Sequence, residues 1–155
     1  LEALTRLGPA LALKWPNDLL LNGGKLSGIL LESGGEGLLV LGIGVNLRHA
    51  PPPEPAAAHP PVSLRAETGF DIAPEVLLGH LAAAYAAWDR RLAAYGFAPL
   101  RTAFRARAAR LGQPLTARTL TETLTGTFET IDETGALILA TPQGRRAIPA
   151  ADIYF

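Results

Sequence analysis

The 155-residue chain contains no cysteine, no methionine and only two lysines. The absence of cysteine excludes disulfide bonds and thiolate metal sites, and the cytoplasm is the expected compartment. Fourteen acidic and 14 basic residues give a formal net charge of zero, so charge favours neither a nucleic acid nor a membrane surface as a partner. No apolar run reaches the roughly 18 residues that a membrane-spanning helix needs, and no signal-peptide pattern opens the chain.

What the chain has in abundance is apolar residues, which make up 48% of it. With balanced charge, this composition is typical of a globular protein. The length suits one domain, or a domain of about 110 residues and a small module. We expect the second arrangement, with a first domain at residues 1–110 and a second at residues 111–155.

The first half of the chain has the pattern of consecutive strands. Residues 1–9 resemble the end of a helix, closed by Gly8 and Pro9. Strands are then expected at residues 10–14, 19–22, 25–32 and 38–46, with a tight turn at Asn22-Gly23-Gly24. The last strand is almost continuously apolar, which predicts burial on both faces. The glycine-rich residues 33–37 predict a hairpin turn and not a phosphate loop, because no Lys-Ser or Lys-Thr follows them.

The second half begins with helices and ends with short strands. Residues 49–61, rich in proline and alanine, are expected to form a surface loop. Helices are expected at residues 62–68, from Pro74 to Gly96, and from Pro99 to about residue 111. The apolar stripe of the second helix is expected to lie across the sheet, and the arginines of the third to form a solvated face. Short strands at residues 114–118, 121–131, 136–141, 145–149 and 152–155 predict a small barrel.

Both lysines, Lys14 and Lys25, lie in the first strands, whereas the other 12 basic residues are arginines. A chain that uses arginine so consistently would be expected to replace a lysine needed only for its charge. Lysine presents a compact ammonium and arginine a wide planar fork, so a cramped anionic site favours lysine.

Three sequence blocks, in this order and spacing, resemble the biotin protein ligase family. They are Lys14-Trp15-Pro16-Asn17-Asp18, Lys25-Leu26-Ser27-Gly28-Ile29-Leu30 and Gly42-Ile43-Gly44-Val45-Asn46. The resemblance implies an α+β fold with a mixed β-sheet and packed helices, related to class II aminoacyl-tRNA synthetases. A small SH3-like β-barrel is expected to follow it.

The resemblance also implies an ATP-dependent ligase. Such an enzyme activates biotin to biotinyl-5′-AMP and transfers it to a lysine of a biotin carboxyl carrier protein, here that of acetyl-CoA carboxylase. Biotin, ATP and Mg²⁺ are therefore the expected small molecules, and the family makes a homodimer an expectation. No nucleic-acid or membrane partner is expected for this chain.

Site residues follow from the same resemblance, position by position. Lys25 is the implied catalytic residue, in contact with the biotin carboxylate and the adenylate phosphate. The implied biotin-binding residues are Lys25, Gly28, Leu30 and Gly42. The implied nucleotide-binding residues are Lys14, Asn17, Asp18 and Asn46, and no metal-ligand set is assigned.

Some of these residues also have a structural explanation that requires no ligand. Pro16-Asn17-Asp18 also suits a tight turn, Asp18 could assist magnesium or hold a lysine in place, and Trp15 is equally a pocket wall or a core residue. Strand alternation places Lys25 and Ser27 on one face and Leu26 and Gly28 on the other.

The chain departs from the family because it lacks the strands that contact the biotin ring and the helix-turn-helix that some relatives carry, as well as a loop. The family's Gly- and Arg-rich loop, of the form Gly-Arg-Gly-Arg-x-Gly-Arg, is absent, and Arg6 is the only arginine before Lys14. We therefore expect a fragment that is inactive alone. Two alternatives remain, a non-catalytic protein-interaction remnant and a lipoate-type acyl ligase or transferase.

Overall fold

The computed structural model describes residues 11–35, 37–55 and 58–155. The helix end expected at residues 1–9 lies outside these residues. The chain divides into two compact units, residues 1–72 and residues 73–155, and each is described by itself. The predicted boundary between residues 110 and 111 stays a prediction.

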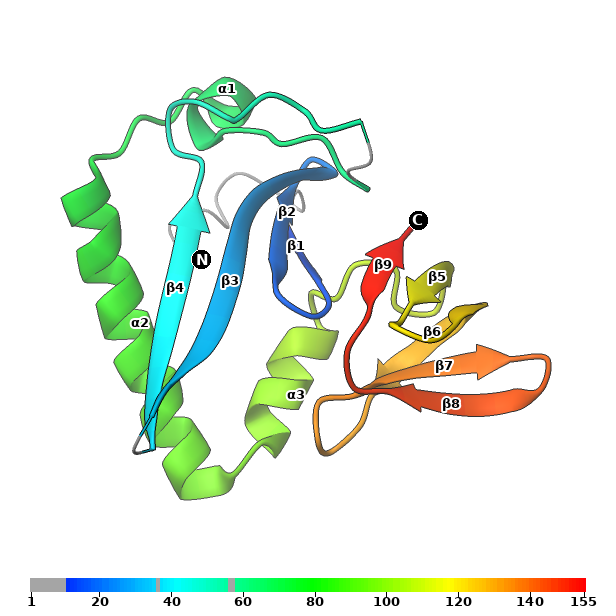
Figure 1. Ribbon diagram of the computed structural model, residues 1–155. Coiled ribbons are helices and arrows are strands. Elements are labelled where there is room, and N and C mark those ends of the chain that lie inside the picture. Colours follow the sequence, from blue (N-terminus) through cyan, green and yellow to red (C-terminus); the bar gives the residue numbers. More distant parts are fainter. Residues whose placement is uncertain (1–10, 36, 56–57) are drawn as a thin grey trace. The chain divides into compact units, whose positions relative to one another are not determined.

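The first unit is built on a four-stranded sheet with the strand order β1-β2-β3-β4 (Figure 1). Its strands are β1 (Leu11–Lys14), β2 (Asp18–Leu21), β3 (Gly24–Gly35) and β4 (Leu38–Val45). Positive φ angles of 50° at Asn22 and 84° at Gly23 close the β2–β3 hairpin, as its turn residues predict. The expected strands are confirmed, and β3 also includes residues 33–35, which were expected in the turn.

Strand pairing is antiparallel throughout both described sheets. The parallel component expected of a mixed sheet is limited, among the described residues, to an isolated bridge between Lys25 and Pro61. With helices α1 to α3, the two sheets confirm the predicted α+β class.

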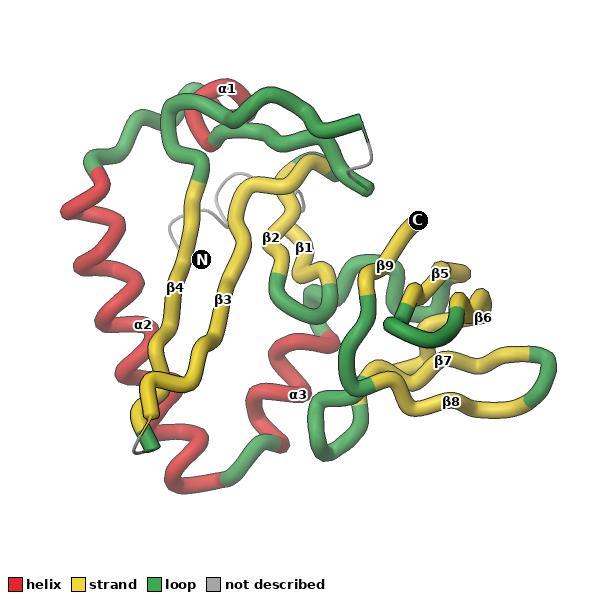
Figure 2. The backbone as a smooth tube through the Cα atoms, viewed as in Figure 1, coloured by secondary structure: helices red, strands yellow, loops and turns green. Residues whose placement is uncertain are grey.

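The burial predicted for β4 is wrong. Leu38 is 64% exposed and Leu39 is 61% exposed. The long β3–β4 ribbon continues past the ends of β1 and β2 (Figure 2), whereas the core of the unit lies at the other end, around Leu21, Leu26 and Leu64. An apolar strand sequence predicts that a strand forms, but it does not say what covers its faces.

Helix α1 (Leu64–Thr68) begins and ends where its capping residues dictate. The Ser63 hydroxyl accepts a hydrogen bond from the Ala66 N–H at the start of the helix, and Gly69 ends it with φ = 73°. These are the favoured residue types at the two ends of a helix. The predicted helix is confirmed.

The second unit opens with helices α2 (Pro74–Tyr95) and α3 (Ala98–Arg105). Pro74 starts α2 and Gly96 ends it, as predicted. The extension of α3 to residue 111 is wrong, because the helix ends at Arg105 and Arg110 takes a positive φ of 60°, which no α-helix accommodates.

The apolar stripe of α2 is only partly covered. Leu77, Leu81 and Trp88 are half-buried, and Tyr85 and Tyr95 are exposed. Its packing across the sheet concerns both units and stays a prediction. No helix in the described part of the chain combines the length and the apolarity needed to cross a membrane.

Five short strands complete the second unit in the order β8-β7-β6-β5-β9. They are β5 (Pro114–Arg118), β6 (Thr123–Ile131), β7 (Leu137–Thr141), β8 (Gly144–Ile148) and β9 (Asp152–Tyr154). Phe128, Leu137 and Leu139 are fully buried between them. The predicted SH3-like barrel is confirmed.

The β6–β7 turn is organised by one carboxylate, that of Asp132. Its Oδ1 accepts hydrogen bonds from the Thr134 N–H at 2.8 Å, the Thr134 hydroxyl at 2.7 Å and the Ala136 N–H at 3.0 Å. The Thr134 hydroxyl is the main cause that holds the pKa of Asp132 below its usual 3.8. The ionised carboxylate therefore stabilises the turn.

This shift predicts how stability changes with pH. Because folding lowers the pKa of Asp132, its contribution is present above the unfolded pKa of 3.8 and is lost as the pH falls through the folded value. Thermal unfolding would be measured for the wild type and for Asp132→Asn as the pH is lowered below 3.8. The melting temperature of the variant is expected to fall less than that of the wild type, because the variant has no carboxylate to protonate at this position. Parallel melting curves throughout the acid range would contradict the assignment.

Candidate functional site

The first unit carries a row of four residues across its four strands. Lys14 pairs with Asp18, Asp18 with Gly28, and Gly28 with Gly44. Residues directly opposite each other in a sheet point to the same face. The two charged residues therefore lie on one face beside two glycines.

Lys25 joins this face through an irregularity in β3. Asp18 pairs with Gly28, but Leu20 pairs with Lys25, so the register between β2 and β3 shifts by one residue. The extra residue of a β-bulge interrupts the normal alternation of side chains. Simple alternation, which places Lys25 and Gly28 on opposite faces, is therefore wrong here.

Both lysines of the chain approach one carboxylate. Lys25 Nζ lies 2.6 Å from Asp18 Oδ1, and Lys14 Nζ lies 3.4 Å from Asp18 Oδ2. The side chains of Lys14 and Asp18 are only 9% and 13% exposed, whereas that of Lys25 is 45% exposed. A charge as buried as Lys14 requires its partner, so Asp18 and Lys14 form the fixed part and Lys25 the accessible part.

The cluster carries one net positive charge, since two ammonium groups face one carboxylate. Lys25 has a flexible four-carbon side chain, and 45% of this side chain is exposed. It can turn from Asp18 toward an anion on the exposed side, while Lys14 continues to neutralise Asp18. Such an arrangement is suited to hold a carboxylate or a phosphate.

Gly28, Gly42 and Gly44 lie on the same face of the sheet as Lys25 and cover it with no side chain; together they are named the glycine floor. A Cβ at Gly28 would lie in van der Waals contact with the ion pair, 3.4 Å from Lys25 Nζ and 3.6 Å from Asp18 Oδ1, so glycine keeps this space beside the pair open. Gly42 pairs with Leu30 on the same face, two residues beyond the Gly28–Gly44 pair. Leu30 is exposed, and it supplies apolar surface next to the charged cluster.

The two predicted asparagines are bound to the backbone. Asn17 Nδ2 donates to the Ile29 carbonyl at 2.7 Å. Asn46 Nδ2 donates to the Val62 carbonyl at 3.0 Å and to the Lys25 carbonyl at 3.4 Å. Both amides therefore help to hold β3 in place. Trp15 is buried in the protein interior.

Sequence reasoning missed the segment that braces Lys25. The Lys25 N–H donates to the Pro60 carbonyl at 2.8 Å, and the Lys25 carbonyl accepts from the Val62 N–H at 3.0 Å. The segment belongs to the end of the proline-rich stretch, which has no strand pattern. Nothing in its residue types indicates a partner 35 residues away.

Gly24 leaves room for the residue 60–62 segment that is hydrogen-bonded to Lys25, which we call the brace, so a larger residue at this position is expected to reduce stability. A Cβ on Gly24 would lie 2.2 Å from Val62 Cγ1 and 3.0 Å from the Pro60 carbonyl oxygen. We expect Gly24→Ala to lower the free energy of unfolding by about 1–3 kcal/mol, measured by urea denaturation. Gly44→Ala is the matched control, because its Cβ would meet nothing closer than 3.9 Å. Equal stability of the two variants would contradict the brace.

Two family models match separate parts of the chain. The model described as Biotin/lipoate A/B protein ligase family matches residues 4–47, which include the two-lysine cluster. The model described as Biotin protein ligase C terminal domain matches residues 111–155, which form the barrel. The first match indicates that residues 4–47 are similar to the biotin and lipoate ligases as a class.

Relatives and solved structures narrow this class. A biotin–[acetyl-CoA-carboxylase] ligase from Paracoccus denitrificans is 56% identical over 157 residues, which span 96% of this chain and 65% of the relative. The bifunctional ligase/repressor BirA of Bacillus subtilis is 33% identical over 91% of this chain and 45% of the relative. The chain therefore belongs to the biotin protein ligase family, although it spans less than two thirds of either relative.

Solved structures of biotin protein ligases have a fold similar to that of this chain. The crystal structure of biotin protein ligase from Aquifex aeolicus matches 98% of this chain and 68% of that chain, with a TM-score of 0.84 and 23% identity. A biotin protein ligase-like protein of unknown function from a Silicibacter species matches 96% of this chain and 66% of that chain, with a TM-score of 0.72 and 26% identity.

Proposed function

We propose that this chain supplies part of the active site of a biotin protein ligase. The proposed reaction is ATP-dependent activation of biotin to biotinyl-5′-AMP, followed by transfer to a lysine of a biotin carboxyl carrier protein. The observation that carries the proposal is the approach of Lys14 and Lys25 to Asp18 beside a glycine floor.

Similar proteins support this choice of substrates. The Paracoccus denitrificans relative is named for acetyl-CoA carboxylase as its acceptor, and the matching Aquifex aeolicus structures include one in complex with biotin and ATP. The biotin carboxyl carrier protein of acetyl-CoA carboxylase is therefore the proposed acceptor. The cytoplasm, which the absence of cysteine favours, is the proposed compartment, and a homodimer is the proposed assembly.

The chemistry joins two anions, so positive charge is the main requirement. A carboxylate oxygen of biotin attacks the α-phosphorus of ATP, the bond to pyrophosphate breaks, and the electron pair leaves with pyrophosphate. Negative charge on the phosphoryl oxygens must be stabilised in the transition state. Lys25 is the accessible ammonium for this role, and it turns from Asp18 toward the carboxylate and the phosphate.

The second step transfers the acyl group. The acceptor amine attacks the acyl carbon, AMP leaves with the electron pair of the broken bond, and the amine loses a proton. Lys25 stabilises the leaving phosphate, while Lys14 continues to neutralise Asp18. Correct positioning of the two reactants supplies much of the remaining acceleration.

The other proposed contacts follow from the placement of the residues. Gly28, Gly42 and Leu30 offer a bare and apolar surface for biotin, which is uncharged apart from its carboxylate. Asn17 and Asn46 lie next to the cluster and are proposed to border the nucleotide.

Magnesium is proposed to arrive with the phosphates of ATP. Among the described residues, no group of three His, Cys, Asp or Glu could hold a metal ion. Mg²⁺ usually binds one or two carboxylates together with substrate phosphates. Both oxygens of Asp18 are paired with lysines, so the phosphates of ATP are proposed as the main ligands of the ion. The chemistry that Mg²⁺ supplies is neutralisation of phosphate charge.

A hybrid ligase tests the proposal. This chain would replace the matching part of the Paracoccus denitrificans ligase, and ATP-dependent transfer of biotin to a purified carrier domain would be measured. We expect an active hybrid and an inactive isolated chain. Lipoate outcompeting biotin would favour the lipoate-type alternative, and a folded but inactive hybrid would favour a non-catalytic interaction module.

A further inference from the structure

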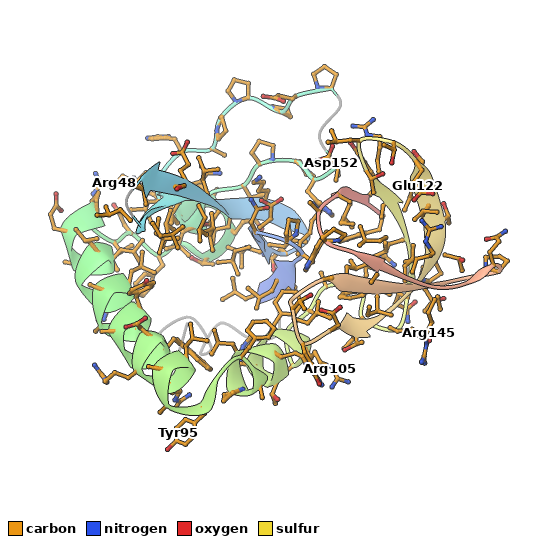
Figure 3. All side chains as sticks on the ribbon, turned by 60° about the horizontal axis from the view of Figure 1, so that its bottom comes forward. Arg48, Tyr95, Arg105, Glu122, Arg145 and Asp152 are labelled. Carbon is orange, nitrogen blue, oxygen red and sulfur yellow. The ribbon has the colours of Figure 1, made fainter. Side chains whose placement is uncertain are left out.

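The second unit has a shallow groove between α3 and the barrel sheet. Its lining combines charged side chains from the helix and the strands with threonine and apolar side chains. The residues that line it include Arg101 and Arg105 of α3, Glu129 of β6, Ile138 of β7, and Arg145 and Ala147 of β8. Figure 3 labels Arg105 and Arg145, one from the helix and one from the sheet.

Positive charge exceeds negative charge in this groove. Arg145 Nε lies 2.7 Å from Glu129 Oε2, so these two charges are paired. Arg101 and Arg105 are four residues apart and therefore lie on the same side of α3. Within residues 11–35, 37–55 and 58–155, neither of them has an acidic partner within 4.0 Å. Two guanidinium groups are left for a ligand.

We propose that this groove binds an acidic segment of a partner protein. Guanidinium groups match carboxylates in shape and charge, and the Arg145–Glu129 pair already shows this pairing inside the groove. Ile138 and Ala147 offer apolar contact for the aliphatic part of a glutamate side chain. No aromatic side chain lines the groove, and proteins that bind single-stranded nucleic acids usually stack bases on aromatic rings.

This proposal does not depend on the ligase reaction. The groove lies wholly within the second unit, whereas the two-lysine cluster lies within the first. A binding measurement on the isolated chain therefore tests it without any catalytic readout.

The test is surface plasmon resonance with the full chain immobilised and hexaglutamate injected. Arg101→Ala combined with Arg105→Ala removes the two unpaired charges. The matched control combines Arg90→Ala with Arg107→Ala, which removes the same charge from exposed positions outside the groove. We expect the groove variant to bind hexaglutamate about tenfold more weakly and the control to change by less than about twofold.

Three results would overturn the proposal. One is the absence of hexaglutamate binding by the wild type, and another is equal weakening in both variants, which would indicate a general charge effect. The third is tighter, groove-dependent binding of oligothymidylate, which would identify a nucleic-acid surface instead. Because all four arginines lie at the surface or are only half-buried, circular dichroism is expected to show folded variants.

Discussion

In the hybrid ligase, replacing Lys25 by alanine is expected to slow biotin transfer by about 100- to 1,000-fold. The ammonium of Lys25 is the accessible charge of the cluster, and its loss leaves developing phosphoryl charge without that partner. Lys14 cannot replace it, because its side chain is only 9% exposed and is held by Asp18. The measurement is the initial rate of biotin incorporation at saturating biotin and ATP.

Lys25→Arg and Arg107→Ala complete this experiment. The arginine variant keeps the charge but brings a wider, planar group next to Gly28, so it is expected to recover only a small part of the rate. Arg107→Ala removes an exposed charge outside the cluster and is expected to leave the rate unchanged. A Lys25→Ala hybrid that retains normal transfer would exclude Lys25 from the chemistry.

Gly126→Ala is expected to have the largest effect on stability, lowering the free energy of unfolding by about 3 kcal/mol. A Cβ at Gly126 would lie 2.3 Å from the Ala140 carbonyl oxygen and 3.0 Å from Leu139 Cγ. Both atoms belong to β7, which pairs with β6 across the centre of the barrel. The clash with backbone cannot be relieved by a side-chain rotation, so the strands must separate.

Urea denaturation followed by circular dichroism measures this effect in the full chain. Gly79→Ala is the matched control, because it lies in α2 and its Cβ would meet nothing within 4 Å. Alanine is a better helix former than glycine, so this control is expected to gain about 0.5–1 kcal/mol. An unfolding midpoint for Gly126→Ala equal to that of the wild type would contradict the close strand approach.

Local chemistry explains why much of the fold could be predicted. Turns and helix ends depend on residues that are close together in the sequence. Asn22-Gly23 forms the β2–β3 turn, Pro74 starts α2 and Gly96 ends it. The end of α3 could not be predicted, because Ala106 carries no stop signal and the positive φ of Arg110 has no sequence signature. The exposure of β4 depends on which surfaces cover it, which the apolar sequence of the strand does not specify.

The candidate site could also be predicted only in part. The sequence blocks predict Lys14, Asp18, Lys25 and Gly28 as site residues, and these residues lie together in the structure. Lys25 and Gly28 lie on the same face of the sheet because the register between β2 and β3 shifts by one residue. No residue type in either strand predicts this shift. The brace at residues 60–62 joins positions far apart in the sequence, and periodicity within a strand contains no information about such a partner.

Pyrophosphate exchange into ATP tests the central claim most directly, because it isolates the activation of biotin from its transfer. The assay would compare the hybrid ligase and its Lys25→Ala variant, with and without biotin. The account predicts exchange that requires biotin and is lost in the Lys25→Ala hybrid. Biotin-dependent exchange at an unchanged rate in that variant would contradict it, as would a folded hybrid without exchange under conditions in which the intact Paracoccus denitrificans ligase is active.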